Sequence, residues 1–266
     1  MSNSASATSP CARAGSTRPG WTPTPRSFHR ASPKSPGSST GNILPTSSPD
    51  IDWRAVDTVL LDMDGTLLDL HFDNHFWQTH VPKRYAEIKG MAHDAAREEL
   101  IARYHARAGS LEWYSVDFWE TELELDIMRL KYEVANLIAV HPSVVEFLAA
   151  VRHAGKRVVL VTNAHHKSVT LKMAKTGLRP HFDAVITSHE LGHAKEEHAF
   201  WHRLQECEPF DPQRSLLVDD SLPVLDSGRD YGIRHLVAVR RPDTRLPEKD
   251  TGDYPAIVSF AEIMPS

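Results

Sequence analysis

The stretch VDTVLLDMDGT, residues 56–66, joins a short, mostly apolar run to two aspartates and a glycine. The run Val56–Leu61 has the length of a strand buried on both faces, and Asp62 follows it directly. Extended geometry places residues i and i+2 on the same side, so Asp62 and Asp64 can face one ligand, and Gly65 lets the backbone turn sharply. The alternative is a capped loop with two solvated carboxylates. Because the pair directly follows a buried strand, we favour a functional site.

Four further apolar runs follow the first one, and helical stretches separate them. Each run is short and rich in Val, Leu and Ile, which is typical of strands covered on both faces of a parallel sheet. The expected strands are Arg157–Val161, Ala184–Thr187, Ser215–Val218 and His235–Val239. The expected helices are Ser143–Ala154, Ser168–Lys175, Lys195–Glu206 and Pro223–Tyr231. Strands that alternate with helices predict an α/β fold with a doubly wound, mostly parallel sheet.

A long insertion separates the first two expected strands. It spans roughly 90 residues, far more than a single crossover helix needs. Within it, Asp94–Ala108 and Val116–Glu124 carry apolar residues three and four positions apart, which indicates helices. We therefore expect a helical cap, residues 70–139, inserted into an α/β core formed by residues 51–69 and 140–266.

Residues 1–50 differ in composition from the rest of the chain. Ser, Pro, Thr and Gly dominate this segment, and four arginines and one lysine stand against a single aspartate. Such a segment buries too little apolar surface to offset its ordering entropy, so we expect a disordered extension. The formal net charge of the 266 residues is -5, which leaves an acidic body behind this basic segment. An acidic body argues against a nucleic-acid partner, which would require a basic face.

Cysteine content and hydropathy bear on the compartment. The chain has two cysteines, Cys11 and Cys207, so no disulfide framework is implied and a reducing cytoplasm is the expected location. No apolar run approaches the roughly 18 residues that span a bilayer, so no membrane partner is expected. The sequence does not indicate an oligomeric state.

Polar residues also follow two of the other expected strands, where ligands bind in doubly wound sheets. Thr162 and Asn163 come after the second strand, where a hydroxyl suits a phosphoryl oxygen, although Thr162 taken alone fits a helix cap equally well. Asp219 and Asp220 come after the fourth strand, and adjacent carboxylates repel each other unless a cation joins them. Hard carboxylate oxygens favour Mg²⁺ as that cation. Lys195 lies downstream of the third strand and could neutralise a phosphate. Taken alone it would be interpreted as a solvated lysine, and only the presence of the other motifs supports this role.

In their order and placement, these pieces resemble the four motifs of the haloacid dehalogenase-like hydrolase superfamily. DMDGT corresponds to the first motif, Thr162 to the second, Lys195 to the third, and Asp219 with Asp220 to the fourth. The resemblance extends over residues 51 to about 240, and the long insertion resembles the helical cap that follows the first motif in part of that superfamily.

The resemblance implies the chemistry of the acidic residues. Asp62 would be the nucleophile that forms an aspartyl-phosphate. Asp64 would protonate the leaving oxygen and then deprotonate the attacking water. A Mg²⁺ cofactor would be held by the Asp62 carboxylate, the Asp64 main-chain carbonyl and Asp220, with help from Asp219.

The resemblance also implies which residues bind the phosphoryl group. Thr162 and Lys195 would hold its oxygens, together with Asn163 and the backbone N–H groups around Gly65 and Thr66. The physical logic is positioning combined with charge neutralisation.

The motifs separate the branches of this superfamily. A dehalogenase has an aromatic residue at the position of Asp64 and therefore lacks the acid. A P-type ATPase has a lysine after the first aspartate, where this chain has Met63, and it has membrane spans. Both branches are disfavoured, whereas a phosphomutase would keep both aspartates.

Beyond the core motifs, the chain resembles the bacterial GMP/IMP nucleotidases, which remove the 5′-phosphate of purine nucleotides. The resemblance rests on Trp53–Trp77, on Leu111–Tyr114 with Asp117–Trp119, and on Val161–Lys172 (VTNAHHKSVTLK). One departure is Ala194, where that pattern has a proline before the lysine. The resemblance implies a purine nucleoside 5′-monophosphate as the substrate.

A purine requires an apolar or aromatic slot with a few polar groups at its edge. We expect His71, Asn74 and one or two cap aromatics to reach the substrate, and the other aromatics to form the cap core. The aromatic candidates are Phe72, Phe76, Trp77, Trp113, Tyr114 and Trp119. His165 and His166 are interpreted as loop residues near the phosphate, because no third ligand supports a zinc site.

Three other functions stay open at this level. A phosphosugar mutase would need a phosphorylated acceptor in place of water. A phosphatase for a sugar phosphate or flavin mononucleotide would share the core chemistry but not the cap preference. A binding protein that has kept the fold without the chemistry would be inert with Mg²⁺.

Overall fold

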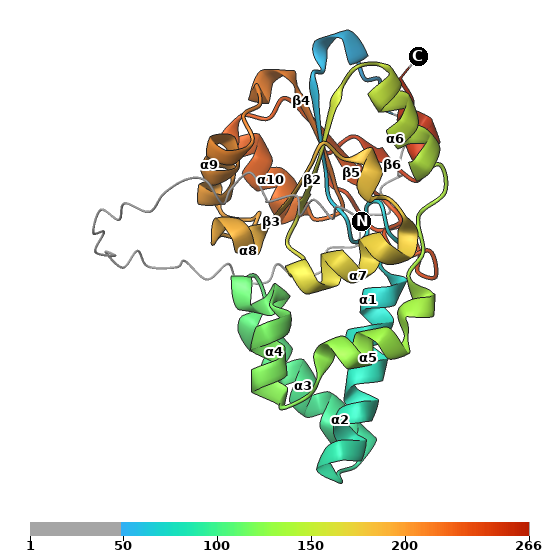
Figure 1. Ribbon diagram of the computed structural model, residues 1–266, viewed down its shortest axis with the longest axis vertical. Coiled ribbons are helices and arrows are strands. Elements are labelled where there is room, and N and C mark those ends of the chain that lie inside the picture. Colours follow the sequence, from blue (N-terminus) through green and yellow to red (C-terminus); the bar gives the residue numbers. More distant parts are fainter. Residues whose placement is uncertain (1–48, 266) are drawn as a thin grey trace, which may run out of the picture.

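The computed structural model describes residues 49–265, and its centre is a six-stranded parallel sheet (Figure 1). The strands lie in the order β3-β2-β1-β4-β5-β6, and every neighbouring pair is parallel. Their bounds are β1 Thr58–Leu61, β2 Arg157–Thr162, β3 Ala184–Thr187, β4 Ser215–Asp219, β5 His235–Val239 and β6 Ala256–Ile257. The doubly wound α/β fold is thus confirmed. The short edge strand β6 was not predicted, because two residues give no periodic signal.

The strand order and register bring the polar strand ends together. β1 lies between β2 and β4, and Leu61 pairs with Leu160 on one side and with Val218 on the other. The chain leaves β1 and β4 through Asp62 and Asp219, which therefore emerge side by side. Successive strands are added on one side of β1 up to β3 and on its other side from β4 onward, so the strand order reverses between β1 and β4. Open α/β sheets bind ligands at such a point.

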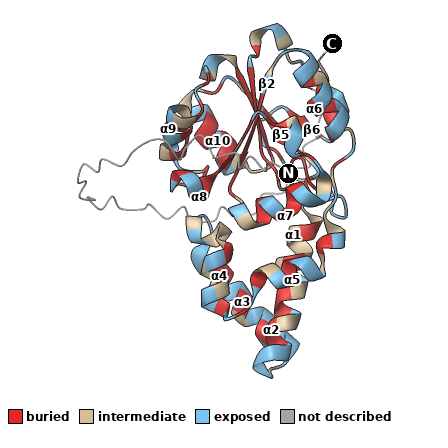
Figure 2. Cartoon of the chain, in the orientation of Figure 1, coloured by how far each residue is buried: buried red, intermediate tan, exposed pale blue. Residues whose placement is uncertain are grey.

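Alternate strand residues face two separate helical layers. On one face, Val59 and Leu61 join a core with α6 (Val144–His153) and α7 (His166–Thr176). On the other face, Leu60 joins a core with α9 (His198–Cys207) and α10 (Leu222–Tyr231). Figure 2 shows the resulting buried centre, with exposed residues on the outer helical surfaces. Both faces are covered, which is why the strands read as continuous apolar runs.

The second helical layer shows one difference from the sequence prediction. The helix expected over Lys195–Glu206 is α9, which spans His198–Cys207 after the short helix α8 (Ser188–Leu191). Lys195 therefore lies in the loop before the helix, with Glu197 at the N-cap position in extended geometry. The main-chain N–H of Lys195 donates to Asn163 Oδ1 at 2.9 Å, so a side-chain contact replaces the first helical turn there. The second helix of this layer is α10, Leu222–Tyr231.

The insertion between β1 and β2 is helical, as expected. Its α-helices are α1 His71–His75, α2 Val81–Lys89, α3 His93–Arg107, α4 Val116–Leu123 and α5 Ile127–Glu133. A π-helical segment, Phe76–His80, joins α1 to α2, and 3-10 turns cover Leu111–Tyr114 and Ala135–Leu137. These helices share a hydrophobic core of their own around Phe76 and Trp119. In Figure 1 they form a separate body that faces α7 across the carboxyl edge of the sheet.

The remaining segments are short. The 3-10 turns of the core span Trp53–Ala55, Arg179–His181, Pro212–Arg214 and Phe260–Ile263. The expected extension, residues 1–50, lies almost wholly outside the described residues. The boundaries of the core, 51–69 and 140–266, and of the cap, 70–139, stay a prediction. None of the helices between residues 49 and 265 has the length and hydropathy that a membrane crossing requires.

Candidate active site

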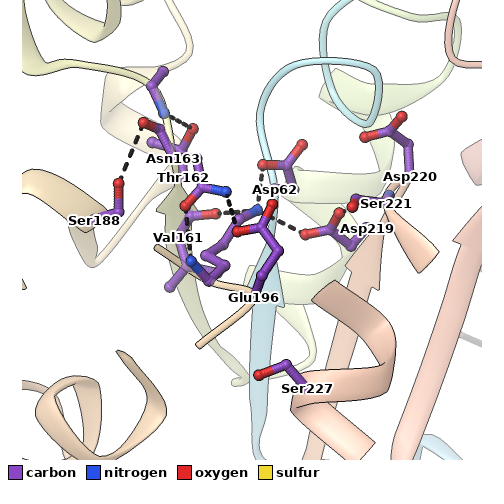
Figure 3. Close-up of polar contacts among 12 residues, drawn as sticks. Asp62, Val161, Thr162, Asn163, Ser188, Glu196, Asp219, Asp220, Ser221 and Ser227 are labelled. Atoms are coloured by element: carbon purple, nitrogen blue, oxygen red, sulfur yellow. Dashed lines mark hydrogen bonds and ion pairs between the residues drawn. The ribbon is translucent and has the colours of Figure 1, made fainter. Parts of the chain in front are cut away.

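A buried lysine joins two aspartates at the carboxyl ends of β1 and β4. Lys195 Nζ donates to Asp62 Oδ1 at 2.5 Å, to Asp219 Oδ2 at 2.7 Å and to the Val161 carbonyl at 3.2 Å. Asp62 is 5% exposed, Lys195 2% and Asp219 1%. Figure 3 shows Asp62 and Asp219 extending toward one another from neighbouring strands. Three residues predicted from separate motifs thus lie in one cluster, because parallel strands end at the same edge.

The electrostatics of this cluster follow from its burial. Burial raises the pKa of Asp62 to about 6, even though the Lys195 ammonium pulls it down. Burial works against the charged form of Lys195, but the carboxylates of Asp219 and Asp62 outweigh it and raise the pKa of the lysine. Lys195 therefore stays an ammonium at neutral pH, where it can neutralise an anionic ligand.

Asp220 adds a third carboxylate to this edge. Carboxylate oxygens of Asp62, Asp219 and Asp220 lie within 4.8 Å of one another. Burial raises the pKa of Asp220 to about 6, against the opposing effect of the Lys249 ammonium, which donates to the Asp220 carboxylate at 3.1 Å. Lys249 also donates to the main-chain carbonyl of Asp220. Like charges held this closely favour a bound cation, and the all-oxygen donor set fits Mg²⁺. Sequence reasoning missed Lys249, which belongs to a loop without a motif.

Asp219 differs from the other two carboxylates in its contacts. Each of its oxygens already accepts one hydrogen bond, Oδ2 from Lys195 and Oδ1 from the Ser221 N–H at 2.9 Å. Burial raises its pKa as well. The contacts of Asp219 therefore indicate that it holds Lys195 in place, in addition to any help in binding a cation.

Gly65 lies directly against the Asp220 side chain. Its φ of +87° is in the left-handed region, and a Cβ at this position would lie 2.8 Å from Asp220 Cγ. A side chain here would push the carboxylate aside, so glycine allows the loop and the acid to meet. The Gly65 N–H donates to the Leu68 carbonyl at 2.7 Å. The neighbouring Thr66 is fully buried, and its hydroxyl has no hydrogen-bond partner among the described residues.

Asp64 binds a second buried lysine, which sequence reasoning gave no role. Lys172 Nζ, on α7, donates to Asp64 Oδ1 at 2.6 Å and to Asp73 Oδ2 at 2.7 Å. Burial raises the pKa of Asp64 to about 6, against the opposing effect of Lys172. The available signal was a lysine at a position that helical periodicity places on the core side of α7, between Leu171 and Met173.

Thr162 and Asn163 lie beside the Lys195 cluster. Thr162 Oγ1 accepts the Ala164 N–H at 3.1 Å, and α7 begins at His166, so Thr162 is not the cap of that helix. Asn163 Oδ1 accepts from the Lys195 backbone, and its amide donates to Glu196 Oε2 at 2.9 Å. These bonds hold the strand end and the Lys195 loop together.

Glu196 extends this network to the cap. The Tyr114 hydroxyl donates to Glu196 Oε1 at 2.6 Å. Burial and the neighbouring Glu196 carboxylate raise the pKa of Tyr114, so its hydroxyl keeps the proton. Sequence reasoning did not single out Glu196, because a glutamate after a loop lysine gives no distinctive pattern.

A cavity of about 520 Å³ lies between the cap and the core. On the core side it is lined by the predicted residues Asp62, Asp64, Thr162, Asn163, Lys195, Asp219 and Asp220, together with His165 and Lys172. On the cap side it is lined by Asn74, Gln78, Arg97, His105 and the aromatics Trp77, Tyr104, Trp113, Tyr114 and Trp119. Phe72 and Phe76 belong instead to the buried cores. The structure therefore combines an ionic end and an aromatic wall in one cavity.

The two polar cap residues predicted to bind substrate lie against Asp243. The Asn74 amide lines the cavity and donates to Asp243 Oδ2 at 2.8 Å. His71 Nδ1 is 3.7 Å from Asp243 Oδ1, and His71 is not part of the cavity lining. Gly65 and Thr66 also lie outside that lining. The roles of these four residues in substrate binding stay predictions.

Comparison with known proteins gives a consistent result. The sequence model of the haloacid dehalogenase-like hydrolases matches residues 56–232. GMP/IMP nucleotidase YrfG from Escherichia coli (strain K12) is 37% identical over 217 residues, which are 82% of this chain and 98% of that protein. A solved HAD phosphatase from Thermococcus onnurineus has a TM-score of 0.67 at 25% identity, with 78% of this chain and 96% of that chain covered. A putative β-phosphoglucomutase from Thermotoga maritima, at 18% identity and a TM-score of 0.56, covers the same shares and shares the fold.

The family match spans most of the described core and cap, and the relative from Escherichia coli aligns along nearly its whole length. The parallel sheet and the inserted helices fit the family match. The chain therefore belongs to the haloacid dehalogenase-like hydrolase family, and it is an enzyme that hydrolyses phosphoric monoesters.

Proposed function

We propose that this enzyme is a Mg²⁺-dependent 5′-nucleotidase that converts purine nucleoside monophosphates such as GMP and IMP to the nucleoside and phosphate. One observation carries the proposal: a single cavity has the Asp62–Lys195–Asp219 cluster at its core end and tryptophan and tyrosine side chains at its cap end. The similarity to a GMP/IMP nucleotidase over 82% of the chain supports the choice of substrate. A cytoplasmic location and a small phosphorylated partner, with no nucleic acid or membrane, belong to the same proposal.

The reaction proceeds in two displacements. An Asp62 carboxylate oxygen attacks phosphorus, the bond from phosphorus to the 5′-oxygen breaks, and the Asp64 carboxyl gives its proton to that oxygen. Asp64, now a carboxylate, takes a proton from water as the water oxygen attacks phosphorus. The bond from phosphorus to the Asp62 oxygen then breaks, which frees phosphate and restores the Asp62 carboxylate.

The remaining residues stabilise charge during these steps. Lys195 and the Thr162 hydroxyl bind the phosphoryl oxygens, and Asp219 holds Lys195 in place. The carboxylates of Asp62 and Asp220 and the Asp64 main-chain carbonyl, with help from Asp219, would hold Mg²⁺, which would supply further positive charge to the phosphoryl group.

The cap side of the cavity suits a purine nucleoside. Its volume of about 520 Å³ is in the range of small-molecule sites. Tyr104, Trp113 and Trp119 contact one another edge-on, with ring centroids 5.1–6.2 Å apart, and Trp119 is fixed by donating to the Trp113 carbonyl at 2.8 Å. Rigid aromatic rings offer a planar base a stacking surface at little entropic cost. A sugar phosphate would leave this apolar wall without a partner.

The test is phosphate release from a panel of nucleoside monophosphates, sugar phosphates and flavin mononucleotide, with Mg²⁺ and with EDTA. We expect GMP and IMP to give the highest kcat/KM and EDTA to abolish turnover. A sugar phosphate at the head of the panel would keep the core chemistry and overturn the purine assignment. Turnover that requires a bisphosphate activator would indicate a mutase, and an inert protein with Mg²⁺ would overturn the enzymatic proposal.

A further inference from the structure

We propose that Lys172 is a positioning residue for the Asp64 carboxyl, and that Asp73 holds Lys172 in place for this purpose. The inference rests on the proposed function in one respect, because it takes Asp64 as the group that protonates the leaving oxygen. It adds a part to the site that the four sequence motifs do not contain.

The contacts of Lys172 fix its ammonium group from several sides. Lys172 is 1% exposed, so water does not compete for its N–H groups. It donates to Asp64 Oδ1 at 2.6 Å and to Asp73 Oδ2 at 2.7 Å, and its ammonium lies 5.2 Å from the centre of the Phe72 ring. Charge-assisted bonds of this length to a buried ammonium group are strong and directional.

A carboxylate needs such a partner to keep one orientation. The terminal torsion of an aspartate is broad, so rotation about the Cβ–Cγ bond is not restricted by the side chain itself. With Oδ1 of Asp64 bound to Lys172, the second oxygen is left for the leaving group in the cavity that both residues line. Proton transfer requires the donor within hydrogen-bond reach of the reacting oxygen, so this orientation affects the chemical step directly.

Asp73 ties this arrangement to the cap. Asp73 is on α1, the first helix after the core motif, and it also accepts from Lys131 on α5 at 3.5 Å. Lys131 is 2% exposed, and its ammonium lies 4.4 Å from the centre of the Phe76 ring. Asp64, Lys172, Asp73 and Lys131 therefore form a chain of alternating charges that runs from the core into the cap. Two negative and two positive groups balance one another, as buried charges must.

The alternating charges also have a purely structural explanation, namely that the buried lysines only neutralise the buried aspartates. The two lysines allow a matched comparison. Both are almost fully buried and both bind Asp73, but Lys172 also binds Asp64. If both lysines had only a structural role, replacing either one would slow the reaction by a factor that does not depend on the leaving group. If Lys172 positions Asp64, only its replacement would slow the reaction more when the leaving group needs a proton.

The experiment compares Lys172→Met with Lys131→Met in single-turnover reactions on two substrates. GMP releases an alcohol that needs a proton, whereas 4-nitrophenyl phosphate releases a phenolate that departs without one. We expect Lys172→Met to slow nucleoside release by about 100-fold and nitrophenol release by less than about tenfold. Lys131→Met should change both rates by the same factor. Equal factors on the two substrates for Lys172→Met would overturn the inference.

A second variant keeps the inference testable if Lys172→Met does not fold. The double variant Lys172→Met/Asp73→Asn removes one charge of each sign and leaves one buried charge of each sign in this cluster, on Asp64 and on Lys131. Circular dichroism and thermal unfolding establish that the variants are folded. The double variant is expected to give the same selective loss on GMP, and a uniform loss would overturn the inference. If the wild-type enzyme prefers another alkyl phosphate, that substrate replaces GMP. Failure of the purine assignment is then detected with the wild-type enzyme alone. Failure of this inference is detected only in the ratio of the rate losses that a variant shows on the alkyl phosphate and on 4-nitrophenyl phosphate.

Discussion

Replacing Gly65 with alanine should raise the Mg²⁺ requirement of the enzyme. The added Cβ would lie 2.8 Å from Asp220 Cγ, and ordinary carbon contacts begin at about 3.5 Å, so the carboxylate must move by about 0.7 Å. Metal–ligand distances tolerate shifts of only about 0.2 Å. The carboxylate is not a loose end that can turn away, because Lys249 binds both it and the main-chain carbonyl of Asp220.

The size of the effect has a backbone part and a metal part. A non-glycine residue in the left-handed region costs about 1–2 kcal/mol, which lowers the melting temperature of a domain of this size by roughly 2–8 °C. Displacing Asp220 should weaken Mg²⁺ binding by about 10- to 100-fold, in line with the loss of a group that orients a metal ligand. Gly155 provides the matched control, because its φ is +72° and an added Cβ would meet nothing within 4 Å.

The assay is a Mg²⁺ titration of initial rate, together with thermal unfolding, for Gly65→Ala, Gly155→Ala and Asp220→Ala. Gly155→Ala should lose stability and keep the wild-type titration midpoint. Gly65→Ala should lose at least as much stability and shift its midpoint toward that of Asp220→Ala. If Gly65→Ala and Gly155→Ala have the same midpoint, the contact with Asp220 does not control the metal and the reasoning is refuted.

Three further results are expected. Asp62→Asn should lower kcat by roughly 10³-fold or more with an unchanged circular dichroism spectrum, because the amide fits the site and is not a nucleophile; near-wild-type turnover would contradict the mechanism. Tyr114→Phe should lower kcat/KM by about tenfold, as expected for one lost hydrogen bond to charged Glu196, and an unchanged kcat/KM would show that this link is dispensable. Burial raises the pKa of Asp62 and Asp220 from 3.8, the value in the unfolded chain, to about 6 in the folded protein. In the metal-free protein, the stability that these two groups contribute is therefore fully present below pH 3.8 and is lost as the pH rises through about 6. Mg²⁺ should consequently raise the melting temperature more at about pH 8 than at about pH 5, and equal shifts would argue against these carboxylates as its ligands.

The structure brings the residues predicted for the ionic end together around one cavity, and three of them come at the end of strands with a strong apolar signal. Asp62, Thr162 and Asp219 lie at strand ends, and the parallel arrangement fixes their common edge. The prediction was weaker for residues outside that edge. Lys195 was expected on a helix and lies in a loop, since its backbone bonds to Asn163 and this contact is between segments far apart in the sequence.

The cap shows the same division. Apolar periodicity predicted α3 and α4, and the rest of the insertion was expected to be mostly helical, but the periodicity did not indicate which polar residues face the cavity. His71 and Asn74 were expected as polar groups at the edge of a purine, and both lie against Asp243, from a loop near the end of the chain. Asp243 is not part of any recognisable motif, and its contacts with these two residues form only because its loop packs on α1.

The sequence by itself determined five of the six described strands, the helical character of the insertion and the order of the four motifs, and it supplied the residues that we propose to react. These features depend on local signals: apolar runs, helical periodicity and polar residues that directly follow them. Only the tertiary structure decided which charges pair. Lys172 with Asp64 and Asp73, Glu196 with Tyr114, and Lys249 with Asp220 each join segments far apart in the chain. From the sequence alone, a lysine or glutamate is interpreted as a solvated surface residue. Its ion-pair partner depends on which groups lie close in space and are shielded from water, and only the folded structure determines both.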